Sequence, residues 1–249
     1  MEIGRLLTAM ITPFDENGEI NYDMAAKLSK AIIDSGSDGL VIGGTTGEAP
    51  TINDQEKLKL FSVVKESIGS EHALIAGTTN NNTKESVKLS KLAEAAEVDG
   101  LLLTVPSYNK PTQDGLYQHF RAISEEVSIP CILYNVPSRT SLNMTDETTI
   151  KLSDLKNIVG IKEASSDLDQ ITRIISNTSD DFKVWSGNDN ETLYILAAGG
   201  YGIVSVAGHI VSSQIKELIG HILEGNIEVA GKEHQRLLEF FNIIFIVTN

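Results

Sequence analysis

Short apolar runs recur eight times along the chain, and a polar or amphipathic stretch follows each of them. The runs begin at Leu6, Gly39, Ala73, Gly100, Cys131, Ile158, Lys183 and Gly202. Successive starts lie 19 to 34 residues apart, which leaves room for a strand, a helix and two short loops. The runs are apolar throughout rather than alternating, as is typical of parallel strands that are buried on both faces.

The stretches between the runs carry the signals of helices. In residues 21–36, Met24 and Leu28 recur at helical spacing, and the pattern stops at Gly36. Thr83 opens another such stretch, where a threonine hydroxyl suits the N-cap position. The alternation of strands and helices therefore predicts an α/β protein with a parallel sheet.

Eight strand–helix units in a row indicate a (β/α)8 TIM barrel. A doubly wound open sheet is the alternative, but it normally has fewer strands and a glycine-rich phosphate loop after the first strand. Here the first run is followed by TPFDENG, residues 12–18, which offers no such loop. The barrel is therefore the predicted fold.

Two further helical patterns follow the eighth run. The first, VSSQIKELIGHILEGN, completes the barrel, whereas the second is an addition that ends in the apolar FFNIIFIVTN. We therefore expect a catalytic barrel domain at residues 1–226 and a partial, shortened C-terminal helical extension at residues 227–249.

The charge balance limits the partners. Acidic residues outnumber basic ones 34 to 20, which gives a net charge of −14. Nucleic acid and anionic membrane surfaces are therefore excluded as bulk partners, and an anionic small substrate requires local positive groups. Cys131 is the single cysteine, so no intramolecular disulfide forms. The start of the chain lacks the features of a signal peptide, and no apolar run reaches about 18 residues, so we expect a cytoplasmic, soluble protein.

Candidate catalytic groups stand at the C-terminal ends of the predicted strands, where barrel enzymes carry them. One lysine, one arginine and several hydroxyl groups are expected to converge on one mouth. The histidines are scattered, and pairs of metal-binding side chains at ligand spacing are missing, so we expect no metal site. The candidates are Thr45, Thr46, Tyr108, Tyr134, Arg139, Lys162, Gly187, Asn188, Asp189 and Ser205.

Lys162 lies in the apolar run IVGIKEA, where a lysine is rare unless something pairs with it or uses it. In one interpretation its stem crosses the core and its ammonium reaches solvent or a carboxylate such as Glu163, whose side chain points to the other face. In the other it is a Schiff-base nucleophile, because burial lowers the amine pKa and leaves neutral amine to attack a carbonyl. Tyr134, on the adjacent strand, is placed to donate the proton that expels water.

The other candidates have structural explanations when each is taken alone. Tyr134 suits a core tyrosine with a satisfied hydroxyl, and Arg139 suits a solvated loop residue. The GGTTGE turn suits a cap for the next helix, although Thr45 and Thr46 also suit hydrogen bonding to a carboxylate. Their joint arrangement is more specific than any one of them.

Six motifs stand at the predicted strand ends: GGTTGEAPT (43–51), SYNKP (107–111), YNVPSRT (134–140), GIKEAS (160–165), SGND (186–189) and GIVSV (202–206). Together they resemble the dihydrodipicolinate synthase family, within the N-acetylneuraminate lyase superfamily of class I aldolase-like enzymes. The similarity runs from AMITPF near the start to HQRLL near the end. The combination of GTTGE, YNVPSRT and GIKEAS is highly specific.

The resemblance implies a condensation of pyruvate with L-aspartate 4-semialdehyde to 4-hydroxy-tetrahydrodipicolinate, without a metal or organic cofactor. This reaction is the committed step of diaminopimelate and lysine biosynthesis. By resemblance, Lys162 forms the imine with pyruvate, and Thr45, Tyr108 and Tyr134 form a proton relay. In the family the tyrosine matching Tyr108 is lent by a neighbouring subunit, so a homo-oligomer, dimer or tetramer, is also implied.

The resemblance further implies four substrate-binding residues. Thr46 helps to hold the pyruvate carboxylate, and Arg139 receives the carboxylate of the semialdehyde. The backbone carbonyls of Gly187 and Val204 shape the pocket. Ser107 departs from the family pattern, since many members have a second tyrosine there.

Two alternative functions are also compatible with the sequence. The first is another pyruvate-dependent lyase that acts on a sialic acid or a 2-keto-3-deoxy sugar acid. Arg139 argues against it, because a long polyhydroxylated substrate has no need of an arginine clamp for a carboxylate. The second is an inactive, truncated paralogue. The intact strand-end residues argue against it, whereas the C-terminus, beyond which full-length members have further helices, argues for it.

A regulatory expectation also follows from the resemblance. Lysine-sensitive relatives bind lysine just beyond the GTTGE turn with two histidines, a serine and a tyrosine. This chain has Asp54, Lys57, Ala49 and Ser107 at the corresponding positions. Lys57 brings a positive charge close to a cationic ligand, so we expect little feedback inhibition by lysine.

Overall fold

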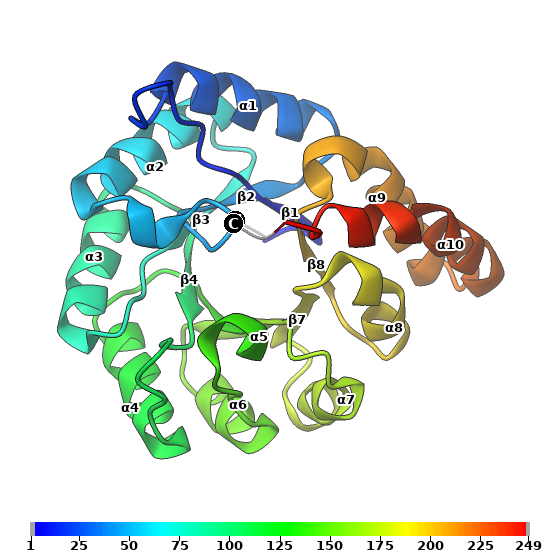
Figure 1. Cartoon of the computed structure of the whole chain (residues 1–249). Helices are drawn as coiled ribbons and strands as arrows, with labels where there is room; N and C mark the ends of the chain where they lie inside the picture. Colours follow the sequence, from blue (N-terminus) through cyan, green and yellow to red (C-terminus); the bar gives the residue numbers. More distant parts are fainter. Residues whose placement is uncertain (1–2, 248–249) are drawn as a thin grey trace.

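Eight parallel strands close into a barrel in the computed structural model of this chain, which describes residues 3–247 (Figure 1). Each strand pairs with its neighbours in sequence, and β1 pairs with β8 to close the barrel. Every strand begins where an apolar run begins, so the predicted (β/α)8 barrel is confirmed. The strands are β1 (Leu6–Ala9), β2 (Gly39–Ile42), β3 (Ala73–Gly77), β4 (Gly100–Thr104), β5 (Cys131–Asn135), β6 (Ile158–Glu163), β7 (Lys183–Ser186) and β8 (Gly202–Ser205).

Helices form a ring around the strands (Figure 1). Within residues 3–247, none of them combines the length and the apolarity that a membrane crossing needs. The α-helices are α1 (Tyr22–Asp34), α2 (Asp54–Ile68), α3 (Thr83–Ala95), α4 (Gln113–Ser124), α5 (Pro137–Thr140), α6 (Asp146–Ser153), α7 (Leu168–Asn177), α8 (Thr192–Ala197), α9 (Gly208–Leu223) and α10 (Ile227–Ile243), and the 3-10 helices are η1 (Ala49–Thr51) and η2 (Asp189–Glu191).

Side chains that cap the helices fix where several of them begin. Asn53 caps α2 in a capping box, in which its side chain accepts a hydrogen bond from a backbone N–H inside the first turn. The predicted cap of α3 at Thr83 is wrong by one residue. Asn82 is the cap, because its side chain accepts hydrogen bonds from the N–H groups of Lys84 and Glu85.

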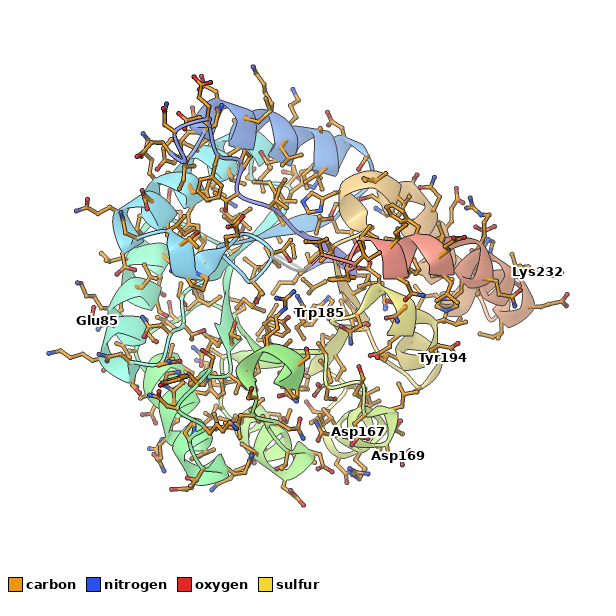
Figure 2. All side chains as sticks on the ribbon, in the orientation of Figure 1. Glu85, Asp167, Asp169, Trp185, Tyr194 and Lys232 are labelled. Atoms are coloured by element: carbon orange, nitrogen blue, oxygen red, sulfur yellow. The ribbon has the colours of Figure 1, made fainter. Side chains whose placement is uncertain are left out.

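The strands separate two apolar layers, because successive side chains of a strand point to opposite faces. Leu7, Tyr134 and Trp185 belong to the layer inside the barrel, where Figure 2 also places Trp185. Their neighbours Leu6 and Leu133 pack in the layers toward the helices. Burial on both faces explains why the strands appear in the sequence as unbroken apolar runs.

The last helix, α10, packs against α9 (Figure 1). It also contacts η2, which follows β7. The Asn190 side-chain amide, in η2, donates to the Asn242 side-chain oxygen at 3.3 Å. Figure 2 shows Lys232 at the outer edge of the molecule on α10. The start of α10 coincides with the expected boundary after residue 226, and the division into two domains stays a prediction. Residues 248 and 249 of the FFNIIFIVTN segment lie outside the described residues.

Candidate active site

Lys162 and Tyr134 lie side by side near the C-terminal ends of β6 and β5. They are partners in the register of the two strands, and both point into the barrel. The Nζ atom of Lys162 lies 4.2 Å from the centre of the Tyr134 ring. Only 4% of Lys162 and 5% of Tyr134 are exposed. The lysine stem therefore does not carry its ammonium out to solvent.

Trp185 packs inside the barrel next to this pair. It is the partner of Lys162 in the β6–β7 register, and its indole N–H donates to the Gly4 carbonyl at 3.1 Å. Gly160 lies on the same face of β6 as Lys162, two residues earlier. A Cβ at Gly160 would lie 2.7 Å from an indole carbon of Trp185, so glycine is needed there. The indole thus fills the barrel interior beside Gly160 and Gly4, on the side of Lys162 toward the N-terminal ends of the strands.

Burial lowers the pKa of Lys162 to about 8 from an ordinary value of 10.5. The Asp189 carboxylate opposes this change, and the positive charge of Arg139 adds to it. A pKa of about 8 leaves roughly one amine in ten neutral at pH 7, about 300 times more than for an exposed lysine. The amine is therefore available as a nucleophile at neutral pH.

The Tyr134 phenol keeps its proton at neutral pH. Burial raises the pKa of Tyr134 to about 12, while Arg139 and a hydrogen bond with the Thr45 side chain act in the opposite direction. A protonated phenol beside a partly neutral amine is a proton donor beside a nucleophile. These are the two groups that imine formation requires.

The turn after β2 supplies Thr45 and Thr46, which are both half-buried. Gly43 begins this turn with a φ of +66°, a conformation that suits glycine. Gly77 on β3 lets the turn approach closely, since a Cβ there would lie 2.2 Å from the Gly43 carbonyl oxygen. The two glycines thus place the threonines at the mouth.

A cavity of about 770 Å³ opens above the ends of β2 to β5. Thr45 lines it, as does Arg139, which lies on the short helix α5. The cavity extends past η1 to the start of α2, where Asp54 and Lys57 line it. An arginine in this wall gives the acidic protein a local positive group for an anionic substrate.

Gly187 and Val204 lie on the other side of Lys162, at β7 and β8. The N–H of Gly187 donates to the carbonyl of Glu163 at 2.7 Å, which ties the end of β7 to the end of β6. Val204 is fully buried in the interior layer with Tyr134. Gly187, directly after β7, and Val204, on β8, therefore both lie beside the site.

Tyr108 does not join the other candidates within this chain. Its side chain is 87% exposed, and its φ of +68° places it in a left-handed turn after β4. It is absent from the lining of the cavity, whereas the preceding Ser107 is part of that lining.

Two buried carboxylates flank Lys162. The sequence patterns gave Asp189 as a candidate without a role and offered Glu163 only as a partner for the Lys162 ammonium. Glu163 is fully buried on the helix side of β6. Asp189 accepts hydrogen bonds from the Ser205 hydroxyl and from the N–H groups of Val206 and Ala207. The only local signal of Asp189 is its place in SGND, because burial depends on the packing of β8 and α9. Across residues 3–247, no group of three or more acidic, histidine or cysteine side chains is arranged to hold a metal ion.

A closed barrel with a buried lysine of lowered pKa beside a protonated tyrosine defines a lyase of the class I aldolase type. A sequence profile described as the Dihydrodipicolinate synthetase family matches residues 2–249. The chain belongs to that family, so the predicted family and enzyme class are confirmed.

Relatives of known name and structure agree with this assignment. A 4-hydroxy-tetrahydrodipicolinate synthase from Dehalococcoides mccartyi is 52% identical over 248 residues, which cover 100% of this chain and 84% of the relative. The crystal structure of a dihydrodipicolinate synthase from Bacillus anthracis is 42% identical, with a TM-score of 0.97 over 100% of this chain and 85% of that one. A lysine-bound structure from Cyanidioschyzon merolae is also 42% identical, with a TM-score of 0.98 over 99% and 85% of the two chains. The similarity supports the synthase prediction over the two alternatives.

Proposed function

We propose that this chain condenses pyruvate with L-aspartate 4-semialdehyde through an imine on Lys162, giving 4-hydroxy-tetrahydrodipicolinate. The observation that carries the proposal is the buried pair of Lys162 and Tyr134, an amine with a pKa of about 8 beside a phenol with a pKa of about 12. The names of the relatives supply the product, and the resemblance to the family supplies the two substrates.

The chemistry follows from these two groups. The neutral Lys162 amine adds to the pyruvate ketone, and the Tyr134 phenol donates a proton so that water leaves the carbinolamine. The protonated imine nitrogen then accepts the electron pair of a methyl C–H bond as that proton leaves, which gives an enamine. The enamine carbon attacks the aldehyde, whose oxygen takes a proton, so the new C–C bond forms and the imine on Lys162 is restored. The amino group of the semialdehyde portion then adds to the imine carbon, and the Lys162 amine leaves as the ring closes. The imine nitrogen is the electron sink, so the proposed cycle requires no cofactor.

The remaining residues have assigned roles in this proposal. Thr45 relays protons to Tyr134, with which it forms a hydrogen bond. Thr46 holds the pyruvate carboxylate and Arg139 receives that of the semialdehyde. Backbone carbonyls of Gly187 and Val204 shape the pocket around them.

Assembly forms part of the proposal through Tyr108. Its exposed side chain suits a residue that completes the relay of a neighbouring subunit. A homodimer is then the smallest complete catalytic unit, and we propose a homotetramer as the assembly. We place the enzyme in the cytoplasm, in diaminopimelate and lysine biosynthesis, which agrees with its single cysteine.

Borohydride trapping tests the proposal directly. The protein is reduced with borohydride in the presence of pyruvate, and the modified peptide is found by mass spectrometry. We expect a pyruvate-derived mass on the peptide that contains Lys162, and turnover in a coupled assay with both substrates. An adduct on a different lysine, or no adduct on folded protein, contradicts the mechanism. Lys162→Arg is the matched control, because a guanidinium stays protonated and cannot attack.

A further inference from the structure

Asn135 and Glu163 form the rung that follows the Tyr134–Lys162 rung on the β5–β6 ladder. Asn135 is the register partner of Glu163, just as Tyr134 is the partner of Lys162. Because side chains alternate along a strand, the reactive pair points into the barrel and this polar pair points toward the helices. Asn135 and Glu163 both have 0% exposure. The two rungs share a backbone, so a shift of one displaces the other.

Uncharged groups donate the hydrogen bonds that the described part of the chain directs to Glu163. The Asn135 amide nitrogen donates to its two carboxylate oxygens at 3.1 and 3.3 Å. The backbone N–H of Ser165 donates at 2.8 Å, and the Gln170 amide on α7 donates at 3.4 Å. Burial raises the pKa of Glu163 to about 7, and the groups that oppose this change are Ser165, Asn135 and Gln170. All of these groups donate hydrogen bonds, so they suit the ionised carboxylate that forms when Glu163 loses its proton near neutral pH.

The same network closes the segment that carries Arg139. The Asn135 amide nitrogen also donates to the Asn143 side-chain oxygen at 2.8 Å and to the Met144 carbonyl at 3.2 Å. The N–H of Met144 donates back to the Asn135 side-chain oxygen at 3.0 Å. Asn135 therefore joins the two ends of the segment that contains α5, and α5 presents Arg139 to the cavity.

We propose that Glu163 is a positioning residue for the condensation: through Asn135 it holds Lys162, Tyr134 and Arg139 at their working positions. The inference rests on the proposed function, which assigns those three residues to the reaction. A buried carboxylate without a cationic partner destabilises a fold compared with an apolar pair of similar volume. Stability therefore does not explain the presence of Glu163. Its position next to Lys162, the proposed nucleophile, gives it a role in positioning.

Glu163→Gln is the informative variant. It replaces one carboxylate oxygen with an NH2 group, which then faces the donor amides of Asn135 and Gln170. We expect kcat, measured with both substrates saturating, to fall roughly 10- to 100-fold, since displacement of catalytic groups by about 1 Å has effects of this size. The unfolding temperature at pH 8 is expected not to fall, because the variant removes a buried charge. A merely structural role predicts that activity and stability fall together.

A compensating variant and a control complete the experiment. In Glu163→Gln combined with Gln170→Glu, the carboxylate returns to the network from α7, and at least fivefold recovery of kcat is expected. Asp99→Asn is the control, because Asp99 accepts hydrogen bonds from Lys65 at 2.6 Å and from the N–H of Leu74 at 2.8 Å, at the opposite end of the barrel. Its kcat is expected to equal that of the wild type.

The outcomes separate this inference from the function on which it rests. Wild-type protein that traps no pyruvate contradicts the proposed function. If the wild type is active and a folded Glu163→Gln variant has a kcat within twofold of the wild-type value, the inference is overturned. The proposed function is then unaffected. If Glu163→Gln does not fold, Glu163→Asp decides, because it keeps the charge but withdraws it by one methylene. A folded Glu163→Asp variant with full kcat would also overturn the inference.

Discussion

The amine of Lys162 faces the ring of Tyr134 inside the barrel, with Nζ 4.2 Å from the ring centre. One dry environment moves the two pKa values apart, to about 8 for the amine and about 12 for the phenol. The cause is the same for both, because burial disfavours the charged form of each group. The barrel interior thereby places a partly neutral amine beside a phenol that keeps its proton, the two groups that the proposed mechanism uses.

Imine formation is expected to follow the ionisation of Lys162. Only the neutral amine attacks, so kcat/KM for pyruvate is expected to rise about tenfold per pH unit below pH 8 and to level off above it. The measurement is the initial rate of borohydride-trapped adduct between pH 6 and pH 10. A rate that keeps rising to pH 10 would show that the amine has the pKa of an exposed lysine.

Tyr134→Phe is expected to remove the proton donor and leave the packing intact. The predicted loss of kcat is roughly 10²- to 10⁴-fold, the usual contribution of a positioned acid. Tyr117→Phe on α4 is the control, because the Tyr117 ring instead faces the Lys151 ammonium at 4.1 Å. Equal activity of the Tyr134 variant and this control would assign Tyr134 to the core alone.

Arg139→Ala is expected to affect the second substrate more than the first. Loss of a bidentate contact with the semialdehyde carboxylate is expected to cost roughly 2–4 kcal/mol in its kcat/KM. Pyruvate trapping is expected to persist in the variant. Arg121→Ala is the control, because Arg121 is an exposed residue of α4 that pairs with Glu125, the residue after the helix. Equal losses for both substrates would indicate a structural role for Arg139.

Glu163 is expected to make the protein less stable as the pH rises. The pKa of Glu163 is about 7 in the folded chain, against an ordinary value of 4.5, so the folded state binds the extra proton between these values. The free energy of unfolding therefore falls from pH 4.5 to pH 7, and the loss, on the order of 3 kcal/mol, is complete above pH 7. Denaturant titrations are expected to show this pH dependence in wild type relative to Glu163→Gln. Parallel curves for the two proteins would contradict it.

Feedback inhibition by L-lysine is expected to be weak. Ala49, Asp54, Lys57 and Ser107 line one cavity, and burial lowers the pKa of Lys57 while Asp54 opposes the change. A cationic ligand meets the Lys57 charge there. With pyruvate saturating, half-inhibition is expected above about 1 mM, which corresponds to roughly −4 kcal/mol of binding. Lys57→Ala is expected to increase the sensitivity, and submillimolar inhibition of the wild type would refute the prediction.

Local pattern alone was enough to predict the barrel and to single out its buried lysine. A parallel strand of this fold is buried on both faces, so its residues form a continuous apolar run. Each observed strand starts where such a run starts. A lysine inside one of these runs is conspicuous for the same reason, which made Lys162 visible. The one-residue error at Thr83 has an equally local cause. Asparagine and threonine both cap helices well, and the adjacent Asn82 took the position.

Only the tertiary structure decided what surrounds the lysine. Glu163 became a hydrogen-bond partner of Asn135 through the β5–β6 register, and of Gln170 through the packing of α7 on the barrel. Tyr108 is exposed because it lies in a left-handed turn, and the residues around it in the sequence do not predict that turn. The burial and the pKa of a group depend on which distant segments exclude water from it. Closure of the barrel brings those segments together, so the neighbouring residues in the chain do not determine either property.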